Sequence, residues 1–184
     1  YHHLTTAFVH TVDRPVTVVH FDNHPDWCRF PPTFNCGGWV SRALAMPHVQ
    51  RVVTLGPMSA PDFRKPEWQS ANLSAISSGR LEVYPWRAEP SQVWRRYPDA
   101  PCWRYSPGQL HWQNLEGLDW SGFLDELVGR LPETALWITI DKDVLAPDEA
   151  TTNWDQGMMP LTHVLAALER VGEKRRIVGV DVCG

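Results

Sequence analysis

Three candidate metal ligands follow an apolar, β-branched run near the start of the chain. The stretch Val16 to Asp26 reads VTVVHFDNHPD, and Asp22, His24 and Asp26 alternate at its end. Residues i, i+2 and i+4 of a strand point to the same side, so this spacing can direct three side chains at one point. Two carboxylates and an imidazole suit Mn²⁺, Zn²⁺ or Fe²⁺. The alternative interpretation is a plain turn after a strand, because Asp, Asn and Pro are common turn residues.

A second β-rich run also ends in acidic residues. The stretch Ala135 to Asp148 reads ALWITIDKDVLAPD, with Asp141 and Asp143 directly after the apolar residues. Taken alone, these aspartates are equally typical of a solvated loop. Two strands of the same design instead favour a parallel sheet whose ligands collect at the edge formed by the carboxyl ends of its strands. The two stretches together therefore predict one shared metal site.

Alternating helical and extended patterns predict an α/β protein with a parallel sheet. In the first helix, Leu4, Ala7, Phe8 and Val12 are expected on the inner face. The expected strands cover residues 16–21, 51–55, 81–84, 135–141 and 176–182, and the expected helices cover residues 3–12, 38–47, 67–78, 121–131 and 161–171.

Both acidic stretches resemble motifs of a known enzyme family. HFDNHPD (residues 20–26) is similar to the DAHxD motif of the ureohydrolases, the arginase, agmatinase and histone deacetylase-like superfamily. TIDKDVLAPD (residues 139–148) is similar to their SxDxDxxDP motif, with the Pro and the following Asp transposed. The resemblance implies an arginase-like fold, which is a three-layer α/β/α sandwich with a mainly parallel sheet.

The resemblance also implies two bound metal ions, usually Mn²⁺, with Zn²⁺ or Fe²⁺ as alternatives. Carried over by position, Asp22 and Asp141 would bridge the two ions. Asp26 would bind one ion, and His24 with Asp143 would bind the other. Asp26 and Asp143 are also the candidates for accepting a proton during the reaction.

The family's remaining ligand is a histidine in a GGDHS motif upstream of DAHxD. Here Tyr1-His2-His3 stands at about the right distance before the first motif, without the glycines and the aspartate. Both His2 and His3 are therefore candidate ligands.

Three other parts of the family pattern differ in this chain. The loop after DAHxD carries a catalytic histidine in the family, and the nearest text here, Phe34 to Gly38, has none. In that loop Asn35 is a candidate substrate contact, and Cys36 is expected to be structural, because the nucleophile of a metal hydrolase is bound water.

The region of the family's Gly-rich substrate loop reads DEATTNWDQGMMP, residues 148–160, and offers Asn153, Trp154 and Asp155 as substrate contacts. Ureohydrolases also carry a strand like DIVEVNP, whose Glu recognises the guanidinium group of the substrate. Gly184 stands at that position when Asp181 is aligned with the motif's Asp. The alignment predicts that arginine itself is not the substrate.

These features predict a metal-dependent hydrolase of a carbon–nitrogen bond in a non-peptide amide or amidine. A metal-activated water at a binuclear site would attack a small molecule or a modified side chain. One alternative is a mononuclear deacetylase-like hydrolase that uses Asp22, His24 and Asp141. The other is a binding or scaffold protein that kept the metal site and lost catalysis.

Length and composition fit one arginase-like domain over residues 1–184, expected to lack segments at both ends because the family's domain is longer. The net charge of −4 argues against a general nucleic-acid binder. No apolar run approaches the roughly 20 residues of a membrane span. Four cysteines without CxxC spacing are typical of reduced thiols and predict a cytoplasmic protein. A homo-oligomer is compatible with all of this.

Residues 85–118 show no clean period and are rich in Trp, Tyr and Arg. This segment is expected to be an insertion that finishes the surface by packing Arg stems on Trp faces. A role in shaping the substrate site is the second interpretation. Stacking on nucleic-acid bases is the weakest, because the chain carries net negative charge.

Overall fold

A five-stranded parallel sheet forms the centre of the molecule in the computed structural model, which describes residues 2–30 and 34–184. The strand order is β3-β2-β1-β7-β8, and all four pairings are parallel. The strands are β1 (Val16–Phe21), β2 (Val49–Leu55), β3 (Leu81–Tyr84), β7 (Ala135–Asp141) and β8 (Ile177–Cys183).

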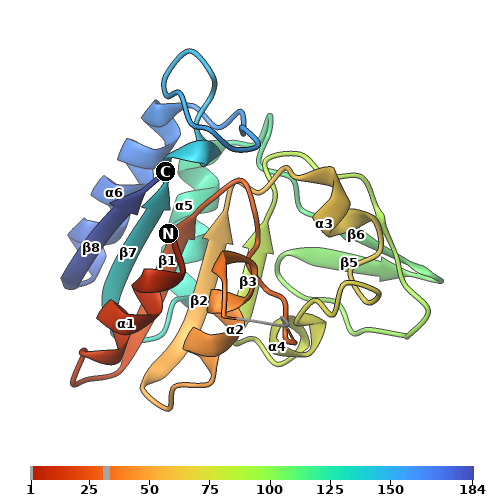
Figure 1. Ribbon diagram of the computed structural model, residues 1–184, viewed down its shortest axis with the longest axis horizontal. Helices are drawn as coiled ribbons and strands as arrows, with labels where there is room; N and C mark the ends of the chain where they lie inside the picture. The colour runs from red at the N-terminus through yellow and green to blue at the C-terminus, as the bar shows by residue number, and fades with distance from the viewer. Residues whose placement is uncertain (1, 31–33) are drawn as a thin grey trace.

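Helices cover both faces of this sheet (Figure 1). On one face lie α1 (Thr5–His10) and α2 (Trp39–Leu44), and on the other lie α5 (Trp120–Arg130) and α6 (Leu161–Lys174). This arrangement confirms the predicted three-layer α/β/α sandwich with a parallel sheet. Within the two described ranges, no helix is long and apolar enough to cross a membrane. The shorter helices are α3 (Ala60–Arg64), α4 (Leu73–Ser77) and the 3-10 turns His2–Leu4, Cys36–Gly38 and Lys142–Val144.

The middle strand β1 determines where the acidic residues meet. All six of its residues are buried, which explains its nearly continuous apolar sequence. It pairs with β7 in register up to Phe21 and Ile140, so Asp22 and Asp141 follow on neighbouring strands. The two acidic stretches therefore end side by side, as the sequence predicted.

The first helix is rotated relative to the prediction. Leu4 and Phe8 are each 48% exposed, whereas Thr5 and Val9 are buried. The Thr5 hydroxyl donates to Asp181 on β8, and this polar contact turns the Thr5 face toward the sheet. The expected inner face was wrong because side-chain polarity alone does not reveal a buried acceptor on a distant strand.

The helix expected over residues 67–78 was too long. Only α4, residues 73–77, is helical there, with turns before it and an Asn72 side chain that caps its first turn by accepting from Ala75 N. The five-residue α3 was not expected, since one turn of helix has no period to recognise.

Residues 85–118 contain a second, antiparallel sheet of order β4-β6-β5. Its strands are β4 (Ser91–Gln92), β5 (Trp103–Ser106) and β6 (Gln109–Trp112). Trp103 and Trp112 are buried and pack edge to face, 5.3 Å between centroids. The cation–π pairs of the described ranges join Arg29, Arg42 and Arg130 to Phe or Tyr rings. The packing of Arg stems on Trp faces in this segment stays a prediction. That this segment is an insertion remains a prediction.

Candidate metal centre

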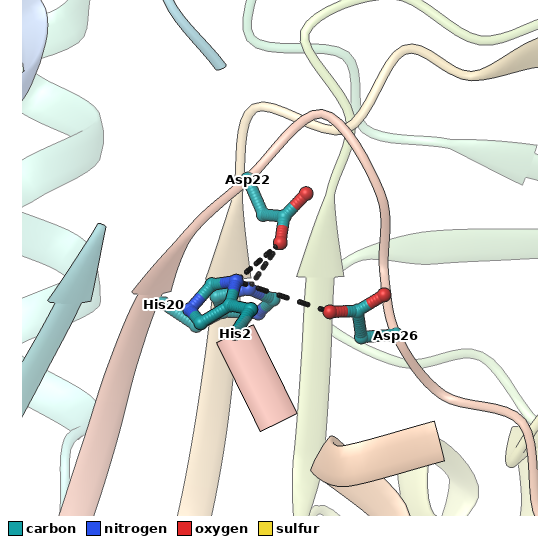
Figure 2. A group of neighbouring side chains, drawn as sticks. All are labelled: His2, His20, Asp22 and Asp26. Carbon is teal, nitrogen blue, oxygen red and sulfur yellow. Dashed lines mark hydrogen bonds and ion pairs between the residues drawn. The ribbon is translucent and has the colours of Figure 1, made fainter. Parts of the chain in front are cut away.

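Asp22 lies at the centre of a buried polar cluster at the carboxyl end of β1 (Figure 2). Its Oδ2 lies 2.7 Å from His2 Nδ1 and 2.9 Å from His20 Nε2, and its Oδ1 accepts from the backbone N of His24 at 2.6 Å. Burial alone would raise the pKa of Asp22, but hydrogen bonds from the three histidines outweigh burial and lower it well below the usual value. Asp22 is thus an ionised carboxylate with donors on both oxygens.

Asp26 reaches the same cluster from an unusual backbone conformation. Its φ is 47°, in the left-handed region that few residues other than glycine adopt. Its Oδ2 lies 3.9 Å from His2 Nδ1 and accepts a 2.7 Å hydrogen bond from the Trp39 indole. Burial and the neighbouring charge of Asp22 raise the pKa of Asp26 well above its usual range. A strained backbone that carries a buried acid into a cluster of acids is typical of a functional site.

The second acidic stretch completes the cluster from β7. His24 Nδ1 lies 3.3 Å from both Asp22 Oδ1 and Asp143 Oδ2, and Asp141 Oδ2 lies 3.6 Å from His2 Nδ1. Burial lowers the pKa of His24, but its bonds to Asp143 and Asp22 prevail and raise it to about 11. Burial is also the main cause that raises the pKa of Asp143, to about 6. Two segments 120 residues apart thus form one charged network.

Two of the ligand groups in this network share Asp22. His2, His20, Asp22 and Asp26 bring ligand atoms within 4.8 Å of one another, and so do Asp22, His24 and Asp143. A third group joins His2 and Asp141 to Cys183, whose Sγ lies 3.2 Å from Asp141 Oδ2. Four buried or half-buried carboxylates repel one another, and divalent cations would offset this repulsion. The oxygen and nitrogen donors fit Mn²⁺, Zn²⁺ or Fe²⁺.

The structure distinguishes the two N-terminal histidines. His2 is 2% exposed and directs Nδ1 at Asp22, whereas His3 is half-buried and packs edge to face on Phe34. The other nitrogen of His2 lies 2.7 Å from the Thr139 hydroxyl, which in turn donates to Asp181. His2 therefore belongs to the cluster and His3 lies outside it.

The cluster forms the floor of a pocket of about 400 Å³. Of the predicted substrate contacts, Asn153 and Trp154 line this pocket. Asn35 and Asp155 are not among the described residues that line it. The backbone oxygen of Asp155 instead accepts from Asn23 Nδ2 at 2.9 Å, so this residue shapes the loop. Sequence reasoning missed the half-buried acid Asp62 in the wall, because α3 carries no recognisable motif. The loop residues 31–33 fall outside the described ranges.

Fold and site together define an arginase-like α/β/α protein with a buried cluster of Asp and His side chains. The chain has the fold of the ureohydrolases, which confirms the resemblance at the level of structure. A proclavaminate amidino hydrolase from Streptomyces clavuligerus matches 99% of this chain and 52% of its own with a TM-score of 0.63 and 20% identity. An arginase from Bacillus caldovelox matches 99% and 57% with a TM-score of 0.64 and 16% identity.

Two further comparisons bear on this similarity. A triple mutant of a T. brucei arginase-like protein bound with Mn²⁺ matches 100% of this chain and 49% of its own, with a TM-score of 0.57 and 16% identity. An uncharacterized protein from Thermotoga maritima is 38% identical over 86 residues, which is 46% of this chain and 35% of that protein. No family model matches the sequence. The chain spans about half the length of the solved structures that it matches.

Proposed function

We propose that this protein is a metal-dependent hydrolase of a carbon–nitrogen bond in a small molecule or a modified side chain. The observation that supports this best is the sharing of Asp22 between two groups of ligand side chains at the floor of one pocket. His2 and Asp26 would hold one ion, His24 and Asp143 the other, and Asp22 and Asp141 would bridge them. Mn²⁺ is the proposed metal, supported by the donor chemistry and by the Mn²⁺ bound to the mutated T. brucei protein of the same fold.

A pair of bound divalent ions would activate a water molecule and polarise the group that is cleaved. The chain's own residues then have separate tasks. Either Asp26 or Asp143 accepts the proton that the attack releases. Trp27 is buried beside the cluster and excludes bulk water from the pocket floor.

The proposed substrate is an amide or amidine other than arginine. Gly184 lies in the pocket wall, where the resemblance places the guanidinium-binding Glu of ureohydrolases. A Cβ built there would lie 2.5 Å from Asp141 Oδ1, so a side chain at this position would displace that carboxylate. Asp62, Asn153 and Trp154 are wall residues that would contact the substrate.

Elemental analysis tests the proposed centre. The full chain is loaded with Mn²⁺ or Zn²⁺ and compared with Asp22→Asn and Asp141→Asn. We expect close to two ions in the wild type and a sharp loss in both variants. Asp125→Asn is the matched control, because Asp125 is an exposed acid on α5 that pairs with Arg170. A metal-free wild type, or equal metal content in all four proteins, would contradict the proposal.

Two alternatives predict different results when the metal content and the hydrolytic activity of the protein are measured. One ion that depends on Asp22, His24 and Asp141 would favour the deacetylase-like arrangement. Two ions without turnover of amides, amidines or esters would favour a binding protein. That second alternative is supported by the loop at residues 34–38, which has no histidine where the family motif carries one. Hydrolysis that stops with chelator and returns with Mn²⁺ would exclude it.

A further inference from the structure

Two fully buried side chains in or against the cluster have no ligand role in the proposed centre. Trp39, at the start of α2, and His20, the penultimate residue of β1, each have an exposed fraction of zero. Their rings meet edge to face, with centroids 4.9 Å apart, and the Trp39 ring also contacts His2 at 5.1 Å. The Trp39 indole therefore packs against both His2 and His20, which lie side by side in Figure 2.

We propose that Trp39 and His20 are positioning residues that orient Asp26 and Asp22 for metal binding. This inference rests on the proposed function, because it assigns tasks around the same centre. Each residue holds the Oδ2 of one acid. Asp22 Oδ1 accepts from the backbone N of His24, and its second lone pair is available to an ion. Outer partners of this kind typically change metal affinity 10–100-fold when they are removed.

The start of α2 holds Asp26 in two ways, and Trp39 supplies the contact with its side chain. Its indole N–H donates to Asp26 Oδ2 at 2.7 Å, and the backbone N of the next residue, Val40, donates to Asp26 O at 3.2 Å. The start of α2 therefore fixes both the side chain and the left-handed backbone of Asp26. Indole N–H is a donor only, so it holds the carboxylate without competing for the ion.

His20 connects Asp22 to the neighbouring strand β2 through contacts of its two ring nitrogens. Its Nδ1 lies 3.1 Å from the Thr54 hydroxyl on β2, and its Nε2 lies 2.9 Å from Asp22 Oδ2. When the Thr54 hydroxyl donates to Nδ1, the proton resides on Nε2 and is donated to Asp22. Both ring nitrogens are then engaged, so His20 acts through Asp22 and not as a ligand.

The two residues should differ in which ion they affect. Asp26 belongs to one ligand group, and Asp22 belongs to both. Trp39→Phe keeps an aromatic ring, although a smaller one, and removes the N–H. It should therefore weaken the binding of one ion about 10–100-fold and leave the affinity for the other within a few-fold of the wild type. His20→Leu should weaken both ions, and His20→Gln, which retains a donor near Nε2, should restore most of the affinity.

Mn²⁺ titration followed by electron paramagnetic resonance measures this without a substrate. The full-length Trp39→Phe variant should show the spectrum of an isolated ion at Mn²⁺ concentrations where the wild type shows a coupled pair. Trp103→Phe is the matched control, because Trp103 is also buried and its indole donates to a backbone oxygen, that of Pro98, outside the cluster. Thermal unfolding of all variants shows whether each one is folded.

The possible results separate the inference from the function on which it rests. Unchanged binding of both ions in Trp39→Phe and His20→Leu overturns the inference alone. Equal weakening of both ions by Trp39→Phe and by Trp103→Phe also overturns it, because it reveals a general loss of packing. Fewer than two ions in the wild type overturns the binuclear function, and the inference with it.

Discussion

His2 Nε2 lies 2.7 Å from the hydroxyl oxygen of Thr139, which fixes a residue near the start of the chain to the centre of β7. The Thr139 hydroxyl donates to Asp181 Oδ1 at 2.8 Å, so its oxygen is free to accept from the His2 ring. This arrangement keeps His2 Nδ1 directed at Asp22. Histidines that bind metal ions commonly have their second nitrogen held in this way.

The first prediction follows from this contact. Thr139→Val keeps the side-chain shape and removes the hydroxyl, so it should weaken metal binding about 10–100-fold as His2 loses its fixed orientation. Isothermal titration with Mn²⁺ measures the change. Thr17→Val is the control, since Thr17 is equally buried in the neighbouring strand and loses its bond to Thr134 instead. Similar affinities in the two variants would contradict the assigned role of Thr139.

The second prediction separates the two adjacent histidines. His2→Asn should lower the Mn²⁺ content of the protein by about one ion per chain, because His2 points into the cluster. His3→Asn should leave the content unchanged, since His3 packs on Phe34 outside the cluster. Elemental analysis of the two variants measures the number of Mn²⁺ ions bound per chain. A loss in the His3 variant alone would show that the assignment is reversed.

The third prediction concerns the close approach of Gly184 to Asp141. Gly184→Ala adds a Cβ 2.5 Å from Asp141 Oδ1, so it should displace this carboxylate and weaken metal binding. Gly117→Ala is the control, because Gly117 also has a positive φ but has no atom within 4 Å of a built Cβ. Both variants should lose some stability to backbone strain, but only Gly184→Ala should lose affinity for Mn²⁺ in a titration.

The fourth prediction concerns metal removal. Divalent ions that bind only the folded cluster should stabilise the protein, by about 2.7 kcal/mol for each bound ion at a free concentration 100-fold above its dissociation constant. Urea unfolding with Mn²⁺ or with EDTA measures this difference. The same comparison on Asp22→Asn should show little gain from Mn²⁺. Equal gains in both proteins would place the stabilising ion elsewhere.

The fifth prediction tests the fold beyond the cluster. Glu82 on β3 is 2% exposed and pairs with Arg51 at 2.9 Å and with Arg130 at 3.3 Å. Glu82→Ala leaves these cations without their buried partner, so it should cost about 3–5 kcal/mol of unfolding free energy. Urea unfolding measures the loss, and Mn²⁺ affinity should be preserved. An unchanged midpoint would show that water replaces the carboxylate at no cost.

Local patterns in the sequence determined the strands and the acids at their ends. β1, β3 and β7 were predicted with their observed bounds, because runs of β-branched residues between turn residues are a strong local signal. The spacing of Asp22, His24 and Asp26 likewise survives in the structure as one cluster. A carboxylate that follows a buried strand lies at the end of that strand, whichever strands pair with it.

Only the tertiary structure decided which distant groups meet. The pairing of β1 with β7 brings His24 next to Asp143, and the 3-10 turn His2–Leu4 directs His2, and not His3, at Asp22. Trp39, Thr139 and Asp62 carried no motif, because their roles depend on which atoms pack against them. Such contacts join residues far apart in the chain, and no local period or spacing encodes them.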